Sequence, residues 1–141
     1  MENSRSRNVS GTQFHHIIPR QVYTGKLTNL SSEDRNNFLV AREFLNEIGF
    51  TADRTNNVGI LLPTGKSDVQ YKGQPLEFDS GRSEHRWSKG HARYNRDVAI
   101  AIADFSRDAR EVGLSNQECF DHVHDIMEGF RQDLRQGFTL A

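Results

Sequence analysis

The chain has 141 residues, of which 35% are hydrophobic and 26% are charged, and these values are typical of one soluble globular domain spanning residues 1–141. The formal net charge of −1 gives no overall support for a nucleic-acid partner. No apolar run approaches the roughly 20 residues that cross a bilayer, and the first residues lack the apolar segment of a signal peptide. With Cys119 as the only cysteine and six histidines, any metal would use imidazole and oxygen ligands rather than thiolates.

The first half of the chain predicts two strands separated by a helix. A strand is expected over Gly11–Ile18, because Pro19 donates no ladder hydrogen bond and ends the run. The connector Arg20–Leu30 follows, and a helix capped by Ser31 or Ser32 runs to about Ile48, with Leu39 extending its apolar stripe and Gly49 ending it. The run Val58–Pro63 is a natural antiparallel mate for the first strand.

The second half predicts a loop followed by two packed helices. Thr64–Gly81 is rich in glycine and holds a short strand near Leu76–Phe78. A helix is expected from Gly90 or His91 to Val112, and a second helix begins at Ser115, where Glu118 three residues later completes a capping box. His122 and His124 lie two apart on this helix, so they point to different sides and are interpreted as structural or solvent-facing.

Two patterns can carry chemistry. A strand end with His15 and His16 can divide its two imidazoles between holding a metal and taking a proton, whereas the alternative is a surface pair without a role. His91 and Asn95 are four residues apart, so an imidazole and an amide oxygen could approach one cation from one helix face. The segment Arg82–Arg96 has five basic residues and one acid, which fits either phosphate binding or a solvated charged face.

The order of these patterns resembles the HNH (His-Me finger, ββα-metal) endonuclease superfamily, and the AHH type of bacterial toxin nuclease most closely. The resemblance rests on Phe14-His15-His16-Ile17-Ile18-Pro19, on Asn57-Val58-Gly59-Ile60-Leu61-Leu62-Pro63 and on Lys89-Gly90-His91-Ala92-Arg93-Tyr94-Asn95. It implies an α+β fold with a ββα-metal core over about 11–98, containing a short β-hairpin and an inserted helix, and a C-terminal helical pair over about 99–137. Phe14 stands where the family has a small residue, and the glycine after the asparagine comes two positions on, at Gly59.

The resemblance also implies roles for individual residues. His16 would be the general base and Asn57 would orient it, while His15, His91 and Asn95 would hold one divalent metal ion, Mg, Mn, Ni or Zn. His85 is a third ligand in place of Asn95, a phosphate contact together with Arg86, or a bystander. The other expected substrate contact is Arg93.

The implied function is a metal-dependent endonuclease that cleaves DNA, or alternatively RNA, with little sequence specificity. A toxin or effector of this kind implies a cognate immunity protein, and it would be cytoplasmic or delivered by a secretion system. A restriction-type or phage HNH nuclease is a second role for the same chemistry. Two other classes are a non-catalytic zinc-stabilised binding module, with all ligands from protein, and a helical adaptor that binds protein through its acidic C-terminal helices.

Overall fold

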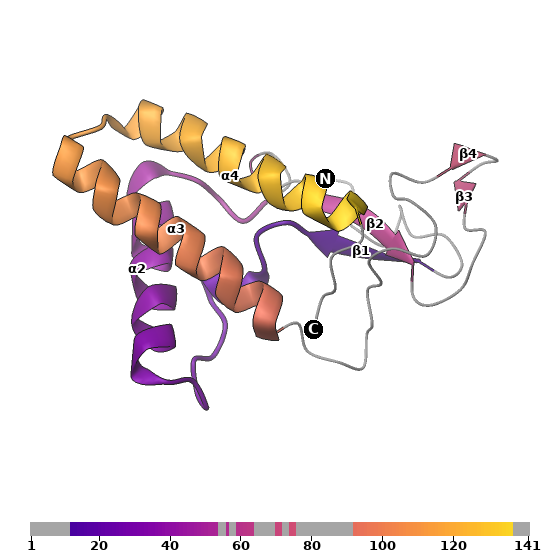
Figure 1. Ribbon diagram of the computed structural model, residues 1–141, viewed down its shortest axis with the longest axis horizontal. Helices are drawn as coiled ribbons and strands as arrows, with labels where there is room; N and C mark the ends of the chain where they lie inside the picture. The colour runs from indigo at the N-terminus through magenta and orange to yellow at the C-terminus, as the bar shows by residue number, and fades with distance from the viewer. Residues whose placement is uncertain are drawn as a thin grey trace.

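The computed structural model describes residues 12–53, 56, 59–63, 70–71, 74–75 and 92–136. The helices gather at one end of the molecule, and the strands extend from them toward the other (Figure 1). In chain order the elements are β1 (Thr12–His16), α1 (Arg20–Tyr23), α2 (Ser32–Ile48), β2 (Gly59–Pro63), β3 (Gln70–Tyr71), β4 (Gln74–Pro75), α3 (Ala92–Val112) and α4 (Asn116–Gln136).

The α+β class with a ββα-metal core, expected from the sequence, is wrong, because the described chain is mostly helical. α2, α3 and α4 contain 17, 21 and 21 residues, whereas β1 and β2 contain five each. Two strands of this length bury too little apolar surface to form a stable unit, so helix packing supplies the core. None of the helices in the described part of the chain combines the length and the apolar character needed to cross a membrane.

β1 and β2 pair antiparallel, with Thr12 opposite Pro63 and His16 opposite Gly59. The segment between them contains α1 and α2, so this is a long-range pair rather than a tight hairpin. β1 ends at His16, two residues before the expected Ile18, because Pro19 is already the N-cap of α1, with φ −64° and ψ 151°. A second two-stranded pair joins β3 to β4, and the strand expected near Leu76–Phe78 lies outside the described residues.

α2 begins and ends as the sequence predicts. The Ser31 hydroxyl oxygen accepts a hydrogen bond from the Asp34 backbone N–H at 3.1 Å, and Gly49 ends the helix in the left-handed conformation with φ 74°. Leu39 does not extend the buried stripe, since 47% of its surface is exposed. The buried face of the helix instead consists of Asn37, Phe38, Ala41, Phe44 and Leu45.

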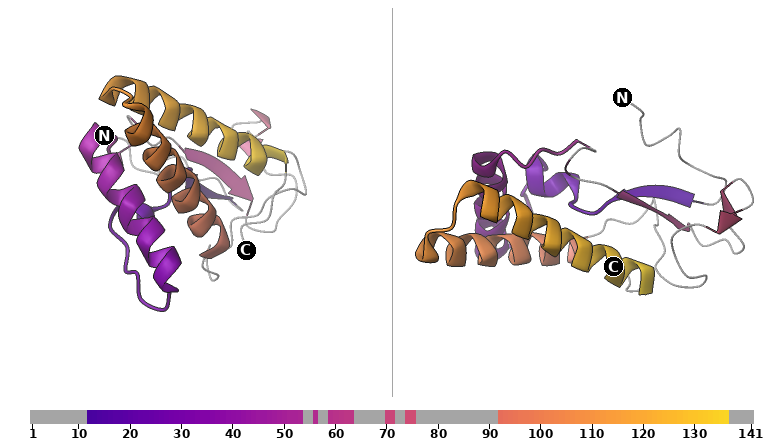
Figure 2. Two further views of the ribbon diagram at one scale, coloured as in Figure 1. Left: turned by 60° about the vertical axis from the view of Figure 1, so that its left-hand side comes forward. Right: turned by 90° about the horizontal axis from the view of Figure 1, so that it is seen from above.

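α3 and α4 form a packed pair, with α3 lying between α2 and α4 (Figure 2). Gly113 at φ 83° ends α3, and Ser115 and Glu118 exchange two hydrogen bonds that form the expected capping box before α4. These helices are not an appendage to a separate core. They contribute about half of one shared core, which includes Val98, Ile102, Ala103, Cys119, Val123, Met127 and Leu134.

The expected irregular connector Arg20–Leu30 contains the short helix α1, and Arg42 of α2 fixes its end. The guanidinium donates to the backbone carbonyls of Gln21 at 2.9 Å, Val22 at 3.2 Å and Gly25 at 2.8 Å. The last carbonyls of a helix have no partner within the helix, and a guanidinium presents several donors in a fixed plane. Arg42 therefore joins α1 and the turn after it to the side of α2.

We expect Arg42→Met to lower the free energy of unfolding by about 2–4 kcal/mol, because three carbonyls lose a charged donor while the methionine retains most of the apolar contact. Arg35→Met on the same helix is the control. Arg35 is exposed, and its bonds to the carbonyls of Leu27 and Leu30 are both 3.3 Å long, so its loss should cost less than about 1 kcal/mol. Urea unfolding followed by circular dichroism measures both values, and equal losses would contradict this account of Arg42.

Candidate active site

One buried hydrogen bond joins the end of β1 to the first turn of α3. The Tyr94 hydroxyl donates to the backbone carbonyl of Ile17 at 2.6 Å, across 77 residues of sequence. Ile17 directly follows His16, and both Ile17 and Tyr94 are buried. Burial, and secondarily the charge of Asp133, raises the pKa of Tyr94, so the hydroxyl keeps the proton that it donates. This bond gives Tyr94 a structural role, because it fastens the start of α3 to the end of β1.

The histidine pair lies at the end of β1. His16 is its last residue, half-buried, and its backbone pairs with Gly59, while His15 pairs with Ile60. The residue opposite His16 has no side chain, so the strand pair itself places nothing over the imidazole from that position. The structure thus presents His16 where the regular ladder stops and the chain turns into α1.

The adjacent asparagines before β2 can be told apart. The Asn56 side-chain oxygen accepts from both the backbone N–H of Thr51, at 2.9 Å, and the Thr51 hydroxyl, at 2.7 Å. Its own N–H donates to the Asp53 carbonyl at 3.3 Å, which closes a turn. Asn56 is therefore a turn residue, and the predicted site residue Asn57 lies outside the described part of the chain.

Asn95 lies in the first turn of α3 and is half-buried. Its amide nitrogen donates to the side-chain oxygen of Gln21 in α1 at 3.0 Å. This bond uses only the amide nitrogen, so it leaves the carbonyl oxygen, the atom that can bind a cation, uncommitted. Arg93, two residues before Asn95, is exposed to solvent.

Not all of the predicted site falls on described residues. His85, Arg86, His91 and Asn57 lie outside them, although His91 directly precedes the first residue of α3. Within the described ranges no three His, Cys, Asp or Glu side chains gather closely enough to hold a metal. The structure therefore brings together the segments that carry His16 and Asn95, and the full ligand set stays a prediction.

The two histidines of α4 have structural partners, as the sequence predicts. The His122 ring stacks on Phe105 with centroids 4.1 Å apart and planes inclined by 13°. His124 packs edge-on against Phe50 at 5.1 Å and contacts Phe120 at 5.3 Å. Both rings therefore pack on aromatic side chains of the helical part of the protein, and neither histidine is one of the predicted site residues.

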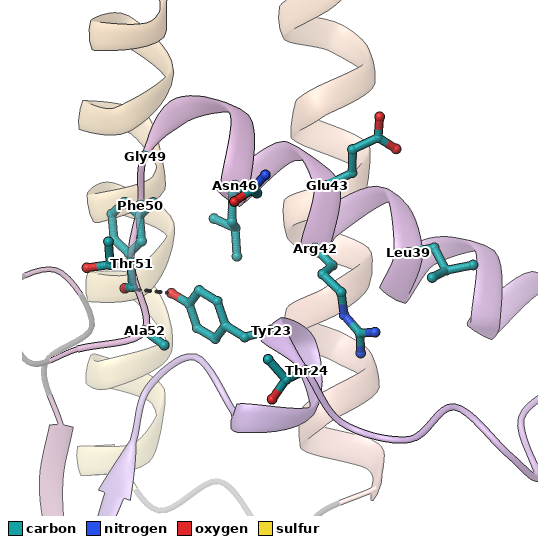
Figure 3. A pocket seen from close by; sticks show the side chains of 11 residues that line it. Tyr23, Thr24, Leu39, Arg42, Glu43, Asn46, Gly49, Phe50, Thr51 and Ala52 are labelled. Atoms are coloured by element: carbon teal, nitrogen blue, oxygen red, sulfur yellow. Dashed lines mark hydrogen bonds between the residues drawn. The ribbon is translucent and has the colours of Figure 1, made fainter.

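A separate pocket of about 740 Å³ lies between the end of α1, α2 and the segment after it (Figure 3). Tyr23 lines this pocket, and its hydroxyl donates a hydrogen bond to the Thr51 backbone carbonyl at 3.2 Å, shown as the dashed line. No residue of the predicted site lines the pocket. Gln21 and Arg42, which support the site from α1 and α2, carried no sequence signal, because neither belongs to a spaced motif.

Tyr94→Phe should lower the free energy of unfolding by about 1–3 kcal/mol, because the buried Ile17 carbonyl loses the donor that the phenol supplied. Tyr23→Phe is the matched control, since its longer bond reaches the exposed Thr51 and should be worth less than about 1 kcal/mol. Urea unfolding of both variants gives the comparison. A loss for Tyr94→Phe no larger than that for Tyr23→Phe would show that the buried bond contributes little.

A family model described as a nuclease family of the HNH/ENDO VII superfamily with conserved AHH matches residues 1–130. No curated protein and no solved structure gives a significant match. The chain has Phe14 where the family motif has alanine, followed by His15 and His16. Because the match covers most of the 141 residues, the chain belongs to the AHH family of nucleases within the HNH/ENDO VII superfamily.

Proposed function

We propose that this nuclease is a metal-dependent endonuclease that hydrolyses phosphodiester bonds of DNA with little sequence specificity. The observation that carries the proposal is the Tyr94–Ile17 hydrogen bond. It fixes the start of α3, which follows His91, against the end of β1, which carries His15 and His16. Two segments far apart in the sequence can then act on one phosphate, as metal-assisted hydrolysis requires.

In this proposal His16 is the general base that takes a proton from the attacking water. A neutral imidazole accepts a proton near neutral pH, and His16 is half-buried at the end of a strand. Asn57 would accept a hydrogen bond from the other ring nitrogen and so fix the orientation of the ring. Asn56 is less suited to that role, because its side-chain oxygen already accepts two hydrogen bonds from Thr51.

His15, His91 and Asn95 are the proposed ligands of one divalent cation. Their nitrogen and oxygen donors suit Mg, Mn, Ni or Zn, and the uncommitted carbonyl oxygen of Asn95 fits such a site. Because the protein would supply only these ligands, coordination positions would stay open for a phosphate oxygen and for water. When bound, the metal would neutralise charge that develops on the scissile phosphate and on the leaving oxygen.

Three exposed arginines lie in α1 and α3 near Gln21 and Asn95 in sequence, and they would bind the nucleic-acid backbone. Arg20 begins α1, and Arg93 and Arg96 lie in the first turns of α3, next to the Asn95–Gln21 contact. Within the described ranges none of the three forms an ion pair. Contacts to phosphates carry no base information, so they favour binding without sequence specificity. His85 and Arg86 would extend the same surface.

The toxin role and the cognate immunity protein rest on the resemblance to bacterial toxin nucleases. A nuclease that cuts DNA without sequence specificity endangers the cell that makes it, which is the physical reason to expect an inhibitor. A restriction-type or phage nuclease would use the same centre. Co-purification with the product of a neighbouring gene would separate these roles.

Supercoiled plasmid incubated with the purified protein and Mg²⁺, Mn²⁺, Ni²⁺ or Zn²⁺ tests the activity. We expect metal-dependent nicking, a fall of at least about 100-fold in His16→Ala because the general base is lost, and unchanged metal affinity in that variant. His122→Ala, which removes an exposed ring stacked on Phe105, is the control and should keep full activity.

A single-stranded RNA incubated under the same conditions separates the two nucleic acids. If the protein cleaves the RNA and leaves the plasmid intact, its substrate is RNA rather than DNA. If the protein cuts neither substrate with any of the four metals, the proposed endonuclease is wrong, and a zinc-stabilised binding module becomes the better explanation of the histidines.

A further inference from the structure

We propose that Gln21 is a positioning residue for Asn95, and that it turns the carbonyl oxygen of the Asn95 amide toward the metal. Gln21 belongs to α1 and Asn95 to α3, and their side chains meet at 3.0 Å. This inference rests on the proposed function, since it takes Asn95 as a metal ligand. It concerns a residue that would touch neither metal nor substrate and would act through Asn95 alone.

The Lys26 backbone carbonyl fixes the direction of both hydrogen bonds that the Gln21 side chain makes. The backbone carbonyl of Lys26 can only accept, and the Gln21 side chain reaches it at 3.1 Å, so Gln21 presents its NH₂ group there. Its oxygen is then the atom left for Asn95, which must donate its own NH₂ group. The Asn95 carbonyl oxygen is consequently turned away from Gln21.

Gln21 is itself held firmly in place. Arg42 donates to its backbone carbonyl at 2.9 Å and to that of Gly25 at 2.8 Å, which closes the turn over the glutamine. Gly25 packs so closely that a Cβ there would lie 2.5 Å from the Gln21 Cα and 2.8 Å from its Cγ. Only a glycine fits this contact, and the contact limits the rotamers open to Gln21.

The orientation matters because the two faces of an amide differ in chemistry and hardly in shape. An oxygen that faces a cation binds it, whereas an NH₂ group in the same place repels it. Without a partner, the Asn95 amide would be free to rotate between the two orientations. Residues that orient a metal ligand in this way commonly change metal affinity by about 10–100-fold when they are removed.

The test measures metal binding, which needs no catalysis. Protein treated with EDTA is titrated with Ni²⁺ by isothermal titration calorimetry, and circular dichroism checks the fold of each variant. We expect Gln21→Leu to weaken Ni²⁺ binding by about 10-fold or more, because the amide of Asn95 loses its acceptor. Gln117→Leu, an exposed glutamine on α4 that bonds to Asp121, is the control and should bind like the unmodified chain.

A double-mutant cycle with Asn95→Ala shows whether Gln21 acts through Asn95. We expect Gln21→Leu to have no further effect once Asn95 is alanine, because the only path to the metal is already removed. Residues in contact are coupled in stability as well, so a purely structural role would show in urea unfolding, whereas the positioning of a ligand lowers Ni²⁺ affinity in variants that remain folded. A second weakening in the Asn95→Ala background would overturn the inference.

Two other results would also overturn it: unchanged Ni²⁺ affinity in Gln21→Leu, or unchanged affinity in Asn95→Ala. Both leave the endonuclease proposal standing if the plasmid is still nicked in a metal-dependent way and the His16→Ala variant fails. Conversely, a protein that binds Ni²⁺ with the predicted coupling and cleaves no nucleic acid would retain the positioning role and lose the enzymatic one.

Discussion

The guanidinium of Arg42 is the contact on which the supporting structure of the site depends. It holds three carbonyls at the end of α1 and in the following turn, and a four-residue helix could not keep its place on hydrogen bonds of its own. Because α1 is fixed to α2, Gln21 meets Asn95 and Lys26 in a defined geometry. A charged group that has no part in the expected chemistry thus determines where the first turn of α3 finds its polar partner.

The site forms at the boundary between the helical core and a small strand pair. α2, α3 and α4 bury most of the apolar side chains and give the protein its stability, whereas β1 and β2 are too short to do so. The Tyr94–Ile17 hydrogen bond connects these two parts. The rigid helices supply a platform, and the strand end brings a histidine to its edge, where a long nucleic acid can reach it. Membership of the AHH nuclease family gives this arrangement its chemical context.

The sequence by itself determined the family and most element boundaries. The histidine pair before Pro19 carries the family resemblance. The Ser31 cap, Gly49 and the Ser115–Glu118 capping box are local signals, and the structure places α2 and α4 where those signals predict. Local signals can be read because capping and left-handed glycines depend on a few neighbouring residues. The predicted α+β class was wrong, since apolar spacing shows that a helix has a buried face and does not show how much of the core it will supply.

Only the tertiary structure decided how the site is supported. Leu39 lies in the same apolar pattern as Phe38 and is nevertheless exposed, because none of the described elements covers it. Gln21 and Arg42 belong to no motif, and their partners are up to 74 residues away, so no local pattern could reveal them. Asn56 and Asn57 are adjacent and chemically alike in the sequence, and the structure shows that two hydrogen bonds from Thr51 occupy the side-chain oxygen of Asn56. Spacing along a chain identifies the residues that could do chemistry, and the folded geometry determines which groups hold them in position.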